Sequence, residues 1–241
     1  MKKDVRTKLE AYASGQSMQK RRSPRRKKLS KKEPVQKPTL ESKVQEVERI
    51  TEIPIEQKHN IIFKPNEGPQ TEFLAAGERE VLYGGSAGGG KSYAMLADPL
   101  RYMGHPSFSG LLLRHTTEEL RELIFKSKEI YPQIWKGIKW SERKMQWEAP
   151  SGARLWMSYL DRDDDVLRYQ GLAFSWIGFD ELTQWSTPYA WNYMRSRLRS
   201  TAPDLPIYMR ATTNPGGRGH GWVKKMFIDP AVPNKAFNAT D

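Results

Sequence analysis

Gly85-Ser86-Ala87-Gly88-Gly89-Gly90-Lys91-Ser92 decides the fold of this chain, because it fits the pattern G-x-x-x-x-G-K-[ST] at every position. The run Glu80–Tyr83 before it predicts a short buried strand. The stretch Lys91–Met103 after it predicts a helix that Pro99 bends or ends. In that context the glycines let backbone N–H groups converge on phosphate oxygens, and the helix N-terminus adds its positive dipole end. These residues therefore predict a nucleoside triphosphate site rather than an accidental glycine-rich turn.

Two residues of this loop carry the expected chemistry. Lys91 would neutralise the β- and γ-phosphates of ATP, and the hydroxyl of Ser92 would ligate Mg²⁺. The sequence thus predicts ATP as the bound nucleotide and Mg²⁺ as the cofactor.

A second apolar strand, predicted over Phe174–Phe179, ends in two acidic residues. Asp180 would hold Mg²⁺ through water, and Glu181 would orient and deprotonate the attacking water. Tandem acids at that place favour a hydrolysing ATPase over a small-molecule kinase, in which the acceptor replaces water. The alternative is a solvated acid pair at a helix N-terminus, and the order of the two roles could be off by one residue.

A third strand, predicted over Ile207–Thr212, runs into the loop Thr213-Asn214-Pro215-Gly216-Gly217. Ligands of parallel sheets lie outside the carboxyl ends of the strands, so Thr213 or Asn214 could bind the γ-phosphate or the attacking water. Taken alone, the residues fit an ordinary Asn-Pro-Gly turn better.

The remaining periodicities complete an α/β pattern. Strands alternating with helices predict a mostly parallel sheet with both faces covered. The further predicted elements are a strand at Gly110–Arg114, an amphipathic helix at Thr116–Ile130 capped by Thr116 or Thr117, a hairpin of Met145–Glu148 with Arg154–Tyr159, and a helix at Pro188–Leu198.

The charge of the chain is concentrated at its N-terminus. The net charge is +12, and residues 1–40 hold 14 of the 40 Lys and Arg but only 3 of the 28 Asp and Glu. Such a segment, poor in apolar residues, predicts a disordered basic tail over 1–45, followed by the folded domain over 46–241. The tail is either a solubilising segment or an arm that contacts nucleic-acid phosphates. Cysteine is absent and no run of 18 apolar residues occurs, which predicts neither disulfides nor a membrane partner.

Four blocks of sequence resemble phage terminase large subunits, in the same order and at plausible spacing: Phe179–Trp185, Arg195–Arg199, Thr213–Gly217 and Gly219–Ile228. The resemblance covers roughly residues 60–240. It implies a P-loop NTPase domain of the ASCE type, with a mainly parallel sheet flanked by helices. It also implies a homo-oligomeric ring on the portal protein that pushes double-stranded DNA into a procapsid, together with a terminase small subunit. The implied location is the host cell cytoplasm, with only transient attachment to the procapsid and no place in the mature virion.

The same resemblance implies further site residues. Gln70 lies in a segment similar to the adenine-reading segment of the family, and an amide can both donate to and accept from an adenine edge. The segment Thr212–Pro215 resembles the coupling motif, which favours the functional interpretation of Thr213 and Asn214. Arg168 resembles a finger arginine acting on a neighbouring subunit, with Arg114 as a competitor.

Members of the family carry a second domain, an RNase H-like nuclease, after the ATPase domain. We do not expect this domain in this chain, so nuclease activity is not predicted for it. The acidic cluster Asp161, Asp163, Asp164 and Asp165 is interpreted as a polar loop or helix start. Two other functions remain open: another P-loop DNA motor such as a helicase, and an inactive fragment that binds DNA or a partner through its basic tail.

Overall fold

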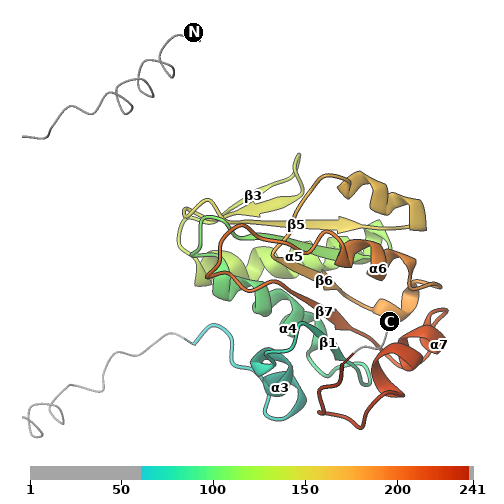
Figure 1. Ribbon diagram of the computed structural model, residues 1–241. Coiled ribbons are helices and arrows are strands. Elements are labelled where there is room, and N and C mark those ends of the chain that lie inside the picture. The colour runs from blue at the N-terminus through green and yellow to red at the C-terminus, as the bar shows by residue number, and fades with distance from the viewer. Residues whose placement is uncertain (1–60, 239–241) are drawn as a thin grey trace, which may run out of the picture. The chain divides into compact units, whose positions relative to one another are not determined.

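A computed structural model describes residues 61–238, which form a seven-stranded sheet with helices on both faces (Figure 1). The strand order is β1-β7-β6-β2-β5-β4-β3. The strands are β1 (Glu80–Tyr83), β2 (Ser109–Arg114), β3 (Lys139–Ser141), β4 (Gln146–Glu148), β5 (Arg154–Tyr159), β6 (Trp176–Phe179) and β7 (Tyr208–Thr212). The α-helices are α3 (Pro69–Ala75), α4 (Lys91–Ala97), α5 (Thr117–Ile134), α6 (Tyr189–Arg195) and α7 (His220–Val223), the last continued by a π-helix at Lys224–Ile228. Three 3₁₀ helices lie at Asp98–Tyr102, Asp163–Tyr169 and Leu182–Gln184.

Five strands of the sheet are parallel: β1, β7, β6, β2 and β5. This confirms the predicted α/β class with a mostly parallel sheet. The predicted hairpin is also present, because β4 pairs antiparallel with β5. The edge strand β3, which the sequence pattern did not predict, pairs antiparallel with β4.

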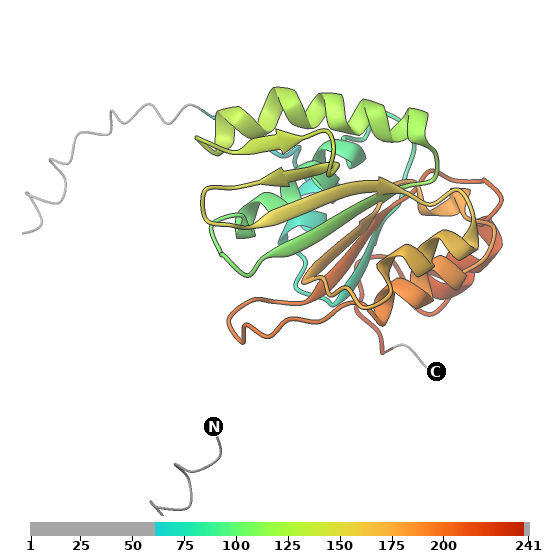
Figure 2. The ribbon, with the colours of Figure 1, turned by 90° about the horizontal axis from the view of Figure 1, so that it is seen from above.

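Alternating side chains of the central strands divide the core into two layers. In β2, Leu112 packs in the cluster on one face of the sheet, while Leu111 and Leu113 pack in the cluster on the other. The first cluster takes in residues of α4 and α5, and the second takes in residues of α6 and the 3₁₀ helix at Asp163–Tyr169. Figure 2 shows these helices on opposite sides of the sheet. Both faces of the parallel strands are therefore buried, as their apolar sequences require.

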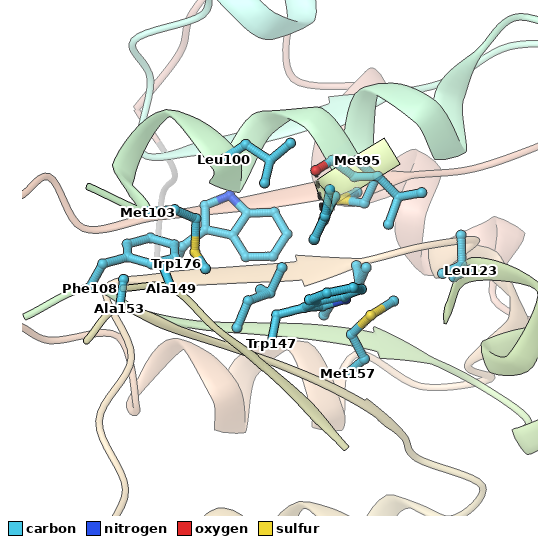
Figure 3. Close-up of a cluster of buried hydrophobic side chains, with 14 of the residues drawn as sticks. Met95, Leu100, Met103, Phe108, Leu123, Trp147, Ala149, Ala153, Met157 and Trp176 are labelled. Atoms are coloured by element: carbon cyan, nitrogen blue, oxygen red, sulfur yellow. Dashed lines mark hydrogen bonds between the residues drawn. The ribbon is translucent and has the colours of Figure 1, made fainter. Parts of the chain in front are cut away.

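A buried indole joins β6 to the helical layer above it (Figure 3). Trp176 is fully buried among Met95, Leu100 and Met103, and its Nε1 donates a hydrogen bond to Oδ2 of Asp98 over 2.8 Å. Asp98 is itself fully buried and forms an ion pair with Arg101 at 3.0 Å. The polar atom of the largest core side chain is thereby satisfied, as a buried indole N–H needs to be.

The predicted effect of Pro99 on the helix expected over Lys91–Met103 is confirmed: the α-helix ends at Ala97 and continues as the 3₁₀ helix Asp98–Tyr102, because Pro99 cannot donate the next helical hydrogen bond. Three other predicted boundaries were wrong. The helix expected over Thr116–Ile130 runs on to Ile134. The strand expected from Phe174 begins at Trp176, and Phe174 forms only an isolated bridge with Leu198. The helix expected over Pro188–Leu198 is confined to α6.

The predicted cap of α5 is confirmed, since Oγ1 of Thr116 accepts a hydrogen bond from the backbone N–H of Glu119. The acidic cluster that begins at Asp161 was predicted to be a polar loop or a helix start, and the structure shows the helix start. A carboxylate oxygen of Asp165 accepts hydrogen bonds from the N–H groups of Asp161 and Arg162. The tail over 1–45 and its boundary with the domain lie outside the described residues and stay predictions. Within the described part, no helix is both long enough and apolar enough to cross a bilayer.

Candidate nucleotide-binding site

The carboxyl ends of four neighbouring parallel strands bring the predicted site residues to one edge of the sheet. The glycine-rich loop follows β1, Asp180 and Glu181 follow β6, Thr213 and Asn214 follow β7, and Arg114 ends β2. Parallel pairing alone places all four strand ends side by side, as expected for ligand sites of such sheets. Residues far apart in sequence therefore share one site.

The loop between β1 and α4 needs its glycines for conformation and for space. Gly85, Gly88 and Gly90 all have positive φ, at 137°, 84° and 73°. A Cβ on Gly90 would also lie 2.6 Å from Nε2 of Gln70, too close for any ordinary contact. Gly90 is therefore fixed both by its left-handed backbone and by the residue packed against it.

Lys91 is buried and folded back onto its own loop. Its Nζ donates to the carbonyl oxygens of Ser86 at 2.6 Å and Gly85 at 3.1 Å. The ammonium group is thus held at the loop by neutral acceptors, which a more strongly charged phosphate can replace.

Asp180 lies fully buried at the end of β6 and is contacted from three sides. Its Oδ2 accepts a hydrogen bond from Oγ of Ser92 at 3.3 Å and forms an ion pair with Nε of Arg114 at 3.0 Å. Its Oδ1 accepts a hydrogen bond from the hydroxyl of Thr212. The carboxylate is therefore oriented by its neighbours, and a buried guanidinium balances its charge.

The Ser92–Asp180 pair fits Mg²⁺. A hydroxyl and a carboxylate oxygen that already lie within 3.3 Å are the hard oxygen ligands that this ion takes in nucleotide sites, where phosphate and water complete its shell. Ser92 and Asp180 would hold the ion, which would supply charge neutralisation at the β- and γ-phosphates.

Glu181 is held by Asn214 through two hydrogen bonds. Its Oε1 accepts from the side-chain amide at 2.7 Å and its Oε2 from the backbone N–H at 3.1 Å. The backbone of Glu181 is left-handed, with φ of 62°, and its own N–H donates to Oγ1 of Thr212 at 3.1 Å. Burial, followed by the nearby charge of Asp180, raises the pKa of the Glu181 carboxyl above its usual range. A carboxylate with a raised pKa is a stronger base than an ordinary surface glutamate.

A pocket of about 270 Å³ opens over these residues. Its lining contains residues from the loop, from the strand ends that carry the acid and the amide, and from two helices: Ala87, Gly88, Gly89, Gly90, Lys91, Ser92, Tyr93, Lys126, Glu181 and Asn214. Two of these lining residues, Tyr93 and Lys126, were not predicted from the sequence. Tyr93 directly follows the predicted loop and could have been found from that place, whereas Lys126 on α5 gave no signal at all.

A sequence model of the family described as phage terminase large subunit matches residues 78–240. The chain belongs to the phage terminase large subunit family. A search among curated proteins finds no significant match.

Solved structures of large terminases share the fold. The large terminase of a thermophilic bacteriophage has a TM-score of 0.53 at 18% identity, over 69% of this chain and 43% of that one. The same thermophilic-phage protein in complex with ADP gives 0.52 at 19% identity, over 67% and 41%. The large terminase of bacteriophage HK97 gives 0.50 at 11% identity, over 62% and 33%. This chain therefore spans less than half the length of these large terminases.

The resemblance to terminases assigned Gln70 to adenine binding, but its side-chain amide forms hydrogen bonds with backbone groups of its own chain. It is buried, its Nε2 donates to the carbonyl of Gly90 at 2.8 Å, and its Oε1 accepts from the N–H of Asn66 at 2.6 Å. Gln70 does not line the pocket. The structure thus shows it bracing the phosphate loop, and its role toward adenine stays a prediction.

Three other predicted residues, Thr213, Arg168 and Arg114, lie outside the lining of the pocket. Thr213 does not line the pocket, and its hydroxyl donates to Oγ1 of Thr183 at 2.8 Å. Arg168 is not brought to the pocket: its guanidinium donates to the carbonyl of Tyr159 at 2.7 Å and is half-exposed. Arg114, the competing arginine, is buried against Asp180 instead.

Proposed function

We propose that this chain hydrolyses ATP as the motor part of a terminase large subunit. The observation that carries the proposal is one pocket that collects a lysine, a serine, a glutamate and an asparagine from separate strand ends and a helix start. Lys91, Ser92, Glu181 and Asn214 are residue types suited to ATP hydrolysis, in positions that converge on one small volume. The thermophilic-phage terminase bound to ADP has the same fold.

In the proposed reaction, a water molecule attacks the γ-phosphorus, the bond to the β-phosphate oxygen breaks, and ADP leaves. Glu181 accepts the proton of the attacking water through the carboxylate that Asn214 orients. Lys91 exchanges its loop carbonyls for phosphate oxygens and neutralises the charge that develops on them. Ser92 and Asp180 would hold Mg²⁺, which would supply charge neutralisation at the phosphates.

The work done with this energy is proposed from the family. The chain would act in a homo-oligomeric ring on the portal protein, move double-stranded DNA into a procapsid, and receive that DNA with the help of a terminase small subunit. It would work in the host cell cytoplasm, attached only transiently to the procapsid and absent from the mature virion. Nuclease activity is not part of the proposal.

One measurement tests the proposal: steady-state ATP turnover of the purified chain alone, with double-stranded DNA and with single-stranded DNA. We expect turnover that double-stranded DNA stimulates. Lys91→Ala should abolish it with little change in thermal unfolding, because the hydrogen bonds of the Lys91 ammonium group stay within its own loop.

The other results decide between the alternatives. Preferential stimulation by single-stranded DNA would favour a helicase. No turnover under any condition, with a folded protein, would favour an inactive fragment. Turnover of Lys91→Ala within a fewfold of the wild type would contradict the site itself.

A further inference from the structure

Lys126 reaches the nucleotide pocket from a helix that carries none of the predicted site motifs. It lies in the middle of α5 and lines the pocket together with Ser92, Glu181 and Asn214. Nothing in the terminase sequence blocks points to this residue. Its position makes it a second lysine of the site, beside Lys91 of the loop.

The position of Lys126 is set by firm packing of α5 against α4. The hydroxyl of the buried Tyr131 donates to the carbonyl of Leu96 at 2.8 Å, which ties the two helices together. Nε2 of Gln184 donates to Oε1 of Glu119 at 2.5 Å, which joins the start of α5 to the segment after β6. On the next turn, Leu123 is buried in the core cluster. These contacts tie the backbone at Lys126 to α4, the helix that follows the loop, and to the segment after β6.

The ammonium group of Lys126 is held at the rim by two weak partners. Its Nζ pairs with Oε1 of Glu122 at 2.5 Å, one turn back on the same helix, and lies 5.8 Å from the ring centroid of Tyr93. Glu122 and Tyr93 are both exposed, and an exposed ion pair at this spacing contributes little. The side chain is thus available to a stronger anion that enters the pocket.

We propose that Lys126 is a phosphate-binding residue of the same chain, which leaves Glu122 and contacts the terminal phosphate of ATP. The inference rests on the proposed function. It assigns the terminal phosphate because Lys126 shares the pocket with Glu181, Asn214 and Ser92. Gln70, the residue associated with the base, does not line this pocket.

Charge supports this assignment. A bound triphosphate carries several negative charges into a pocket that Glu181 already lines and whose Ser92 contacts the buried Asp180. The other lysine that lines this pocket is Lys91. Lys126 adds a cation from α5, outside the loop. It also gives α5 a contact that exists with ATP and is lost with ADP, so that hydrolysis would release the lysine back to Glu122.

The experiment measures the affinity of the full chain for MgADP and for a non-hydrolysable Mg·ATP analogue, by calorimetry. Lys126→Ala should weaken binding of the analogue by roughly 10- to 100-fold, the range for losing a hydrogen bond to a charged group, and leave MgADP within about twofold. Lys126→Arg should keep most of the affinity, because it keeps the charge. Lys128→Ala is the matched control: Lys128 lies two residues on, pairs with Glu142 over Trp140, and does not line the pocket.

Each remaining outcome is decisive. Unchanged analogue binding by a folded Lys126→Ala would overturn the proposal, as would equal losses for ADP and the analogue. An equal loss of analogue affinity in Lys128→Ala would show that the effect comes from general surface charge, and would also overturn the proposal. If the wild-type chain bound neither nucleotide and turned over no ATP with either DNA, the proposed function itself would fail, which separates the two failures.

Discussion

Glu181 combines a left-handed backbone, a half-buried carboxylate and a double hydrogen bond from Asn214. A non-glycine residue with positive φ is uncommon and is kept only where the surroundings hold it. Here the holding groups are the hydroxyl of Thr212, which accepts from the Glu181 N–H, and the amide of Asn214. The end of β7 and the loop after it thus hold Glu181, the acid after β6, in its conformation. The segment Thr212–Pro215, which resembles the coupling motif, therefore has a structural role: it orients Glu181.

Replacing Glu181 should separate nucleotide binding from chemistry. In Glu181→Gln the side chain keeps its shape but cannot accept the proton of water, so turnover should fall by roughly 10²–10⁴-fold while Mg·ATP affinity persists. Asp180→Asn, the matched change next door, should instead shift the Mg²⁺ concentration that turnover requires. The two roles would be wrongly assigned if Glu181→Gln lost affinity and kept its rate. Turnover and equilibrium binding titrations on both variants decide this.

From the burial of Glu181 and its hydrogen bonds to Asn214 we predict how turnover depends on pH. The base must be ionised to act, so turnover is retained above its pKa and lost as the pH falls through it. Because burial raises the pKa of Glu181, the acidic limb of turnover should lie above the ordinary glutamate value of 4.5. Asn214→Ala removes one donor that stabilises the carboxylate, so the limb should move to still higher pH. Profiles of kcat against pH for both proteins test this, and a limb that stays in place or moves toward lower pH would rule it out.

The sequence alone could predict those site residues that come after the predicted strands. Lys91, Asp180, Glu181 and Asn214 follow apolar strands, and parallel strands end together, so their meeting follows from local patterns. The place of Lys126 could not be predicted that way. Which side chain of an amphipathic helix borders a pocket depends on how that helix packs, here on the contact between Tyr131 and α4.

At the scale of elements, the contact between α4 and β6 depends on a residue with no side chain. Gly178 faces the same layer as Trp176, and a Cβ there would lie 2.3 Å from the indole and 2.8 Å from Sδ of Met95. Met95 lies in α4, the helix that follows the phosphate loop. The packing of Met95 and Trp176 at this point of the sheet therefore leaves room only for a glycine.

Gly178→Ala should destabilise the domain by about 1–3 kcal/mol or more, the usual cost of overpacking a core. The indole or Met95 would have to move, and α4 with it, so nucleotide affinity should weaken as well. Gly77→Ala is the control, because a Cβ at Gly77 meets nothing within 4 Å. Urea unfolding of the two variants measures the difference. Equal midpoints would show that this contact tolerates a methyl group.

Elements with strong patterns were predicted well, and those determined by their neighbours were not. The period of α5 and its Thr116 cap are local signals, and both are confirmed. The strand β3 is three residues long, and its middle residue Trp140 pairs with Trp147 of β4, so it exists through its partner rather than through its own sequence. The early end of α4 follows from Pro99, whose effect was predicted but not its extent.

At the scale of the whole molecule, Arg168 is presented outward rather than toward its own pocket. It lies over the ring of Tyr159 at 5.2 Å and is flanked by the exposed Leu167. We propose that it acts on the nucleotide of a neighbouring subunit. An arginine supplied in this way is worth about 10³–10⁵ in rate.

Mixing inactive subunits tests this role. Arg168→Ala and Lys91→Ala should each lack turnover, and a mixture should recover part of it wherever an intact loop meets an intact arginine. Arg114→Ala is the comparison, because its partner Asp180 lies in its own chain and mixing should not restore it in the same way. The absence of recovery in mixtures shown to co-assemble would count against a role for Arg168 across subunits.

The place of β1 also bears on how the chain comes to be folded during its synthesis. Among the described strands, β1 pairs only with β7, and Glu80 lies opposite Met209. The strand before the phosphate loop therefore cannot pair until about 130 further residues have left the ribosome. Contacts of such long sequence separation slow folding and expose unpaired strands to aggregation. A nascent chain halted before Tyr208 should therefore leave β1 open to proteases and chaperones, and protection of the loop should appear only once β7 has emerged.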